Sequence, residues 1–295
     1  MMTVAVVIVT YHNSEMLSCL LEDLTAQSRP PDCIIVVDNT GSEAAGAKIA
    51  ERFPTIEYIR MPENAGSAGG YHEGLRVALD RCDLIWTLDD DVRLRRDTLD
   101  ELLKGFDALR KVHKLGAVRC VGPNHKSFTR PLPIIPWRGT LFCREALLDI
   151  SLPQSEYFLY GEDLDYSFRL AHKGYRCFYI PSSVCFDTRN KGKAEFKISS
   201  HTIKMYSSPF RLYYAFRNET AIYLKYRALL PFLRTMLYSF KVILFSLIFS
   251  GDGKKEKVQA ILKGIADGLS GRLGKNPRYN PIEEQKEPKS VKAPT

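Results

Sequence analysis

Three consecutive aspartates follow an apolar run in LIWTLDDDVRL, residues 84–94. Adjacent carboxylates repel one another and are rarely buried without a partner. Such hard oxygen ligands suit Mg²⁺ or Mn²⁺, ions that commonly bridge protein carboxylates to substrate phosphates. In an extended strand Asp89 and Asp91 point to one side and Asp90 to the other, so the outer two could share one ion. A helix N-cap is the alternative, but it explains only one aspartate.

A second acidic group lies in GEDLDYSFRLAHKGY, residues 161–175, whose apolar spacing predicts a helix that begins near Glu162. The N–H groups of a helix N-terminus favour an ionised carboxylate, so Asp163 could be a charged residue of a site. An ordinary acidic first turn explains the same residues at least as well. Asp165 and Arg169 have the spacing of a structural ion pair. The pattern alone leaves both interpretations open.

The scaffold for these acids is predicted by strands and helices that alternate along the first half of the chain. The continuously apolar, β-branched segment at residues 3–11 predicts a strand buried on both faces, and residues 33–39 predict a second buried strand. A third, shorter strand is predicted at residues 56–62 and a fourth at residues 83–91. Helical spacing of apolar residues predicts helices at residues 14–27, 43–53, 67–81 and 96–112. Alternation at this spacing indicates βαβ units, and therefore an α/β fold with a mostly parallel sheet.

Polar residues follow all four predicted strands. Thr10 ends the first strand, Asp38 ends the second, Asn64 and Gly66 follow the third, and the three aspartates end the fourth. Ligands of such sheets bind beyond the carboxyl ends of the strands. Turn chemistry alone explains any one of these clusters. Four clusters at one edge favour a binding site.

An aromatic residue outside these strands could also contact a ligand. The segment WRGTLFCREAL, residues 137–147, places Trp137 before a glycine. An aromatic ring with one polar atom can stack on a sugar or pack in the core. We expect a sugar contact for Trp137 and core packing for Phe142.

Taken in order, five segments resemble the successive motifs of family-2 glycosyltransferases with the GT-A fold. They are VVIVTYHN, IIVVDNTGS, ENAGSAGG, WTLDDDV and YFLYGEDLDYSFRLAHKGYRCFYIPSSVCF. The combination of NAGSAGG with DDD is similar to galactofuranosyl- and rhamnosyltransferases that build bacterial or archaeal cell-surface glycans. The resemblance implies a Rossmann-like nucleotide-sugar-binding sheet with helices on both faces. It also implies transfer of one sugar with inversion, from UDP-galactofuranose or dTDP-rhamnose.

The resemblance implies donor-binding roles for five residues. Thr10 and Asp38 would line the nucleoside pocket, with Asp38 accepting a hydrogen bond from the base. Asn64 and Gly66 would lie near the ribose and the diphosphate. Asp90 would lie close to the donor ribose or sugar.

The resemblance also implies the metal ligands and the catalytic acids. Asp89 and Asp91 would bind Mg²⁺ or Mn²⁺. Asp163 would be the general base, with Glu162 beside it. The family often has a histidine after the later IPSSV strand, where this chain reads SSVCFDTRN. Asp187 is therefore the nearest candidate for a third ligand.

Two other functions share some of these features. A sugar-phosphate nucleotidyltransferase would also use a carboxylate metal site, but it needs a glycine-rich, basic N-terminal loop. The segment VTYHNSEM contains neither glycine nor Lys or Arg. A non-catalytic nucleic-acid or membrane-binding module could be built on the basic C-terminal third, but it leaves the four strand-end clusters without a purpose.

The net charge of +8 is concentrated in one part of the chain. Residues 188–241 contain eleven Lys or Arg and two acids, an excess of nine positive charges. The apolar stretch at residues 236–250 contains one lysine and is shorter than the roughly 20 residues of a spanning helix. We therefore expect a helix that lies on an anionic membrane surface. A helix packed on the catalytic domain is the alternative.

These features predict three regions. Residues 1–205 would form the catalytic domain, residues 206–273 a basic, aromatic helical region associated with a membrane, and residues 274–295 a disordered tail. Seven scattered cysteines without a Cys-x-x-Cys pair suit a reducing compartment. We expect a peripheral protein at the cytoplasmic face of the cell membrane, acting on a lipid-linked glycan and binding no nucleic acid.

Overall fold

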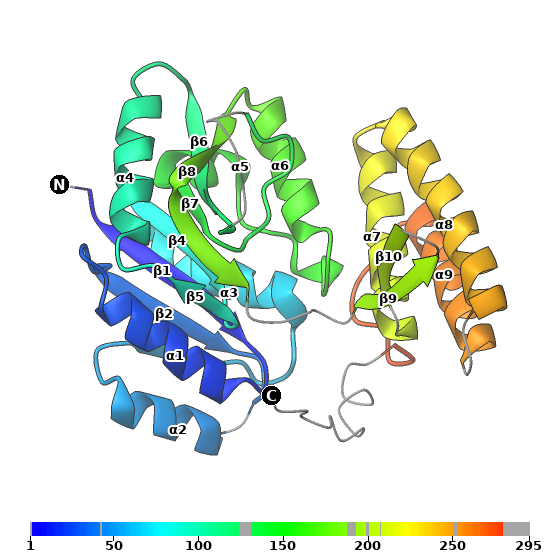
Figure 1. Ribbon diagram of the computed structural model, residues 1–295, viewed down its shortest axis with the longest axis horizontal. Helices are drawn as coiled ribbons and strands as arrows, with labels where there is room; N and C mark the ends of the chain where they lie inside the picture. The colour runs from blue at the N-terminus through cyan, green and yellow to red at the C-terminus, as the bar shows by residue number, and fades with distance from the viewer. Residues whose placement is uncertain are drawn as a thin grey trace. The chain divides into compact units, whose positions relative to one another are not determined.

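The computed structural model describes residues 2–41, 43–123, 131–187, 193–198, 201–206, 208–249 and 253–279 (Figure 1). The chain divides into two compact units, Met1–Lys191 and Gly192–Thr295. This division falls slightly before the expected one after residue 205. The first unit contains all the candidate site residues from Thr10 to Asp187.

The first unit is built on an eight-stranded sheet in the order β3-β2-β1-β4-β7-β6-β8-β5. The four predicted strands are present and parallel, and they are β1 (Val4–Thr10), β2 (Cys33–Asp38), β3 (Glu57–Arg60) and β4 (Leu84–Asp89). The remaining strands are β5 (Val92–Leu94), β6 (Leu115–Val121), β7 (Thr140–Cys143) and β8 (Arg176–Asp187). Strand β7 runs antiparallel to β4 and β6, and β5 runs antiparallel to β8. The expected mostly parallel sheet is confirmed, with two short antiparallel strands in addition.

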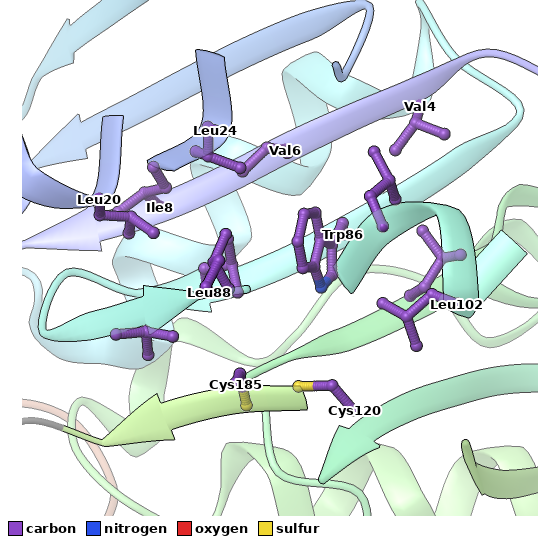
Figure 2. Packing of buried hydrophobic residues seen from close by; sticks show 14 of the residues in the cluster. Val4, Val6, Ile8, Leu20, Leu24, Trp86, Leu88, Leu102, Cys120 and Cys185 are labelled. Atoms are coloured by element: carbon purple, nitrogen blue, oxygen red, sulfur yellow. The ribbon is translucent and has the colours of Figure 1, made fainter. Parts of the chain in front are cut away.

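Helices cover both faces of this sheet, as expected. One face packs against α1 (Ser14–Thr25), α2 (Glu43–Arg52) and α4 (Thr98–Leu109). The other face packs against α3 (Gly66–Leu79), α5 (Arg144–Ile150) and α6 (Glu162–His172). Figure 2 shows the first face, where Leu20 and Leu24 of α1 lie over Val6 and Ile8 of β1. Alternate residues of β1 enter opposite cores, so the strand reads as continuously apolar.

The strand register brings the predicted polar ends together. Thr10 lies beside Asp38 in the β1–β2 pair, and Val9 lies beside Asp89 in the β1–β4 pair. Strand β8 ends at Asp187, whose backbone pairs with Val92. Because parallel strands share a carboxyl edge, the ends of β1, β2 and β4 line one side of the unit.

The second unit contains a β-hairpin and three helices. The hairpin comprises β9 (Lys193–Ile198) and β10 (His201–Tyr206), and the helices are α7 (Pro209–Lys225), α8 (Leu229–Phe249) and α9 (Lys254–Leu269). Helix α9 approaches α7 closely at Gly264 and Gly268, where an added Cβ would lie 2.6 Å and 2.5 Å from α7 carbonyl oxygens. Small residues at this spacing allow two helix backbones to meet.

The segment after α9 also belongs to this folded unit. The ring of Tyr279 stacks on Tyr213 with centroids 4.2 Å apart, and Asn276 Nδ2 donates to the Tyr213 hydroxyl. Residues 274–279, assigned above to a disordered tail, therefore pack on α7. The remainder of that tail lies outside the described residues.

Candidate active site

Asp38 lines a pocket of about 230 Å³ at the ends of β1 and β2. The carboxylate is almost fully buried, at 1% exposed, and accepts hydrogen bonds from the Thr40 N–H (2.8 Å), the Thr40 hydroxyl (2.7 Å) and the Tyr58 hydroxyl (2.6 Å). Burial and the contact with Asp38 raise the pKa of Tyr58. A carboxylate can accept about four hydrogen bonds, so Asp38 can accept one more, from a ligand. Thr10 lines the same pocket, so the two predicted nucleoside residues do lie together.

Gly66 is the first residue of α3. It allows residues 64–68, called the glycine loop below, to pass another segment closely. Its φ is +70°, and an added Cβ would lie 1.8 Å from the Phe158 carbonyl oxygen. The Asn39 side chain accepts from the Ala65 N–H (3.2 Å) and donates to the Gly66 carbonyl (3.0 Å). Asn64 Oδ1 accepts from the Gly66 N–H at 2.9 Å. Asn64 therefore shapes the backbone of this loop.

The three aspartates have different surroundings. Strand β4 ends at Asp89, and Asp90 and Asp91 occupy the following turn, so the expected strand alternation stops at Asp89. Asp90 turns toward β1, where it accepts from the Thr10 hydroxyl at 2.8 Å. Asp89 accepts from the Tyr71 hydroxyl of α3 at 3.1 Å. Asp91 is buried.

Helix α6 begins at Glu162, as predicted. The Glu162 side chain is 3% exposed, and its Oε1 accepts from the Ser67 hydroxyl at 2.5 Å. Within the described part of the chain its Oε2 has no hydrogen-bond partner. Asp163 Oδ1 accepts the N–H of Leu164 at 2.8 Å, so the helix N-terminus does contact this carboxylate. The expected Asp165–Arg169 ion pair is present.

The residues just before α6 have an unusual backbone. Phe158 and Tyr160 have φ of +61° and +63°, values that non-glycine residues adopt only with strain, and Gly161 has φ of +84°. The Phe158 carbonyl accepts from the Ala68 N–H at 3.2 Å. This turn therefore ties the start of α6 to the first turn of α3.

The acids at the end of β4 and the start of α6 influence one another electrostatically. Burial, reinforced by the charges of Asp163 and Asp89, raises the pKa of Glu162 to about 8. Burial also raises the pKa of Asp163 to about 6. The charge of Asp89 adds to this upward shift, and the Arg119 guanidinium opposes it. Burial likewise raises the pKa of Asp90 to about 6. The two acidic groups predicted from distant segments thus share one site.

The donor atoms of this site suit a divalent cation. Asp89 and Asp91 supply hard carboxylate oxygens, and a cation would relieve the repulsion among the acids. Among the described residues, no three His, Cys, Asp or Glu side chains form a metal-binding group. Two carboxylates can still bind Mg²⁺ or Mn²⁺ when phosphates and water complete the coordination. The side chain of Asp187, the third candidate ligand, lies outside the described residues.

The predicted sugar contact of Trp137 is wrong. This side chain is 5% exposed and stacks on Tyr71, with ring centroids 4.7 Å apart. It belongs to the same hydrophobic cluster as Phe142, whose core position was predicted correctly. Trp137 therefore supports Tyr71, the hydroxyl of which contacts Asp89.

Three partners of the site acids were missed from the sequence. Tyr58 donates to Asp38, Ser67 donates to Glu162, and Tyr71 donates to Asp89. Ser67 and Tyr71 lie on the first two turns of α3, close behind Gly66. Their position was the signal that could have identified them, because the first turns of a helix that begins beside a strand-end site face that site.

The model of the family described as glycosyl transferase family 2 matches residues 5–162, more than half of the chain. Galactofuranosyltransferase GlfT1 of Mycobacterium tuberculosis is 27% identical over 215 residues, covering 63% of this chain and 68% of that protein. The protein of the same name in Mycolicibacterium smegmatis is 24% identical over 210 residues, covering 62% and 68%.

Solved structures with a similar fold include mannosyltransferase PcManGT from Pyrobaculum calidifontis, in complex with GDP-Man and Mn²⁺. It superposes with a TM-score of 0.58 at 19% identity, covering 94% of this chain and 77% of that one. S. aureus TarS 1–349 in complex with UDP-GlcNAc superposes with a TM-score of 0.57 at 18% identity, covering 92% and 84%. These likenesses concern the fold.

Proposed function

Because the chain belongs to glycosyl transferase family 2 and has the family's GT-A fold, we propose that it transfers a single sugar with inversion from a nucleotide sugar to a cell-surface glycan. Family membership makes it a glycosyltransferase, which sets aside the nucleotidyltransferase and the non-catalytic module. The proposed donor is UDP-galactofuranose or dTDP-rhamnose. Relatives named galactofuranosyltransferase support the first of these. The observation that carries this proposal is the proximity of Asp89 to Glu162 and Asp163, whose pKa values its charge helps to raise.

The nucleoside of the donor would occupy the pocket of Asp38 and Thr10. Asp38 is held by Thr40 and Tyr58, so its carboxylate is oriented before a ligand arrives. An N–H of the base would donate to it. The loop of Asn64 and Gly66 would pass beside the ribose and the diphosphate, and Asp90 would lie near the donor ribose or sugar.

A divalent cation is proposed as the cofactor. Asp89 and Asp91 would hold it, with Asp187 as a third candidate ligand, and it would neutralise the charge of the departing diphosphate. Two neighbours in fold, PcManGT and GalNAc-T7, were solved with Mn²⁺, which supports a divalent ion in this fold.

Asp163 is proposed as the general base, with Glu162 beside it. Its carboxylate would take the proton of an acceptor hydroxyl while that oxygen forms a bond to the anomeric carbon. The bond from the anomeric carbon to the diphosphate breaks in the same step, and the nucleoside diphosphate leaves with the electron pair. Attack from the opposite side inverts the configuration. Burial raises the pKa of Asp163 to about 6, and the Arg119 guanidinium opposes this shift, so above that pH the carboxylate has the ionised form that a base requires.

The acceptor is proposed to be a lipid-linked glycan at the cytoplasmic face of the cell membrane. The basic charge of residues 188–241 supports a peripheral position on an anionic surface. An enzyme attached there would meet an acceptor confined to the same surface.

The test uses the purified full-length chain and four donors: UDP-galactofuranose, dTDP-rhamnose, GDP-mannose and UDP-N-acetylglucosamine. Release of nucleoside diphosphate is measured with Mn²⁺, with Mg²⁺ and with EDTA. We expect one of the first two donors to be hydrolysed fastest, and only with a metal. Preference for GDP-mannose or UDP-N-acetylglucosamine would refute the proposed sugar, and undiminished activity in EDTA would refute the metal.

A further inference from the structure

Helix α8 exposes a row of large apolar side chains and buries several hydroxyl residues, the opposite of a helix in a water-soluble bundle. Three of the five buried residues in its described part carry hydroxyls, Thr235, Ser239 and Ser246, and the other two are Val242 and Phe245. Its exposed side carries a row of large apolar side chains, the apolar stripe: Leu230, Leu233, Leu237, Phe240, Leu244 and Leu247. Phe240 is 68% exposed, whereas Val242 is 1% exposed.

Two of the inward-facing hydroxyls have partners within the unit. Thr235 donates to Glu219 Oε2 of α7 at 2.9 Å, and Ser239 donates to the Met236 carbonyl at 2.7 Å. A helix in water instead buries its leucines and exposes its serines. Small and hydroxyl residues between helices, with large apolar residues outside, are typical of helices that contact lipid.

Basic residues flank the stripe. Arg234 and Lys241 are both exposed and lie two helical turns apart, on the same flank of the stripe. The sequence of α8 contains no Asp or Glu. An apolar stripe beside charges of one sign complements a surface that has acyl chains below and anionic phosphates above.

The same cations disfavour a helix that crosses the membrane. Among the described residues one helix is long and apolar enough to span, Leu229–Ile248, with a mean hydropathy of 1.4. The helix reaches this length by including Pro231 and Arg234, beyond the shorter stretch noted in the sequence. A spanning position would place Lys241 near the middle of the hydrocarbon. A helix lying flat lets both side chains extend to the headgroups.

We propose that α8 lies flat in the surface of an anionic membrane, with the apolar stripe at the boundary between headgroups and acyl chains and with Arg234 and Lys241 at lipid phosphates. This deepens the proposed function by identifying which surface of the chain attaches it to the membrane of its acceptor. A second copy of the chain, or its own first unit, could cover the stripe instead, and both are outcomes of the test.

The first experiment removes part of the stripe from the full-length protein. Binding to vesicles of phosphatidylcholine with phosphatidylglycerol is measured by sedimentation, without donor or metal. The double variant Leu237→Gln, Phe240→Gln should bind at least about tenfold more weakly. The control Val112→Gln, Leu148→Gln changes two exposed apolar residues of the first unit and should bind normally. Unchanged vesicle binding by the stripe variant would overturn the proposal. Self-association of the wild-type protein that the stripe variant loses and the control keeps would also overturn it, because a second copy would then cover the stripe.

The second experiment tests the charges. Arg234→Gln, Lys241→Gln should weaken binding to the anionic vesicles roughly tenfold to thirtyfold at low salt, since each cation near such a surface contributes about a fivefold factor. Binding to phosphatidylcholine alone should not change. The control Arg96→Gln, Lys111→Gln alters exposed cations of the first unit. An equal loss in the control would mean that only net charge matters, and the assigned flank would be wrong.

The third experiment measures depth. Trp86 and Trp137 are buried in the first unit, so Phe240→Trp adds an exposed reporter. Its emission should shift to the blue with vesicles and be quenched most by lipids brominated near the headgroup. Strongest quenching by bromines near the chain ends would indicate a spanning helix and overturn the flat position. No donor or metal is present, so failure of the proposed chemistry would leave these results unchanged.

Discussion

Glu162→Gln should stabilise the metal-free protein, and the gain should grow with pH. Glu162 is buried, and its pKa is raised from the usual 4.5 to about 8. Between these values the folded protein holds a proton that the unfolded chain has lost, so the wild-type protein loses stability as the pH rises through this window. Glutamine has nearly the same shape and no charge, so this side chain does not lower the stability of the variant as the pH rises.

The magnitude follows from the size of the shift. One pKa unit corresponds to about 1.4 kcal/mol, so the full shift limits the effect to about 5 kcal/mol. Little of this appears near pH 5, and most of it appears near pH 8. Three pH units at about 1.4 kcal/mol each limit the gain of the variant over the wild type between pH 5 and pH 8 to about 4 kcal/mol. For a unit of this size, this limit corresponds to roughly 8 to 16 °C in Tm.

The assay is unfolding of the full-length protein in EDTA, followed by tryptophan fluorescence. Both tryptophans, Trp86 and Trp137, are buried in the first unit, so the signal reports on the unit that contains Glu162. Glu51→Gln, on the exposed side of α2, is the matched control and should show no pH-dependent gain. An equal gain at both pH values, or a wild type more stable at pH 8 than at pH 5, would refute the assigned role of buried charge.

Three further variants test the site. Asp91→Asn should nearly abolish metal-dependent donor hydrolysis while the fold survives, and full activity at limiting Mn²⁺ or Mg²⁺ would show that Asp91 is no ligand. Asp163→Asn should reduce turnover roughly 10²- to 10⁴-fold with donor affinity little changed; lost donor binding at normal saturated turnover would place it in the donor pocket instead. Gly66→Ala would force a Cβ to 1.8 Å from the Phe158 carbonyl, so unfolding should become easier by about 1–3 kcal/mol or more, and a normal melting curve would contradict the close approach.

The sheet could be predicted where the chain carried a strong periodic signal. Strand β1 is apolar from Val4 to Val9, and β4 is apolar apart from Thr87 and the terminal Asp89, because both faces of these strands are buried. The helices between the first strands have regular apolar spacing. Strands β5 and β7 are three and four residues long and antiparallel to their neighbours. Such short strands are determined by the partners that tertiary folding brings beside them, which local sequence does not contain.

The site could be predicted at the level of strand ends but not of side-chain partners. Thr10, Asp38 and Asp89 lie together because neighbouring parallel strands share one edge, a property of the topology. The hydrogen bond from Ser67 to Glu162 joins residues 95 positions apart and depends on how α3 packs beside α6. Trp137 illustrates the same limit, because its residue type suits a sugar or a core equally and only the packing against Tyr71 decides.

The contacts between the glycine loop and the start of α6 explain why the two acidic groups share one environment. Ser67 donates to Glu162, the Ala68 N–H donates to the Phe158 carbonyl, and Gly66 leaves no room for a side chain against the same carbonyl. The loop is fixed in turn by Asn39 at the end of β2. A displacement of the loop would therefore move the acids of α6 as well. The residues proposed for donor binding and for proton transfer are therefore held on one connected frame, and residues held in this way are pre-organised together.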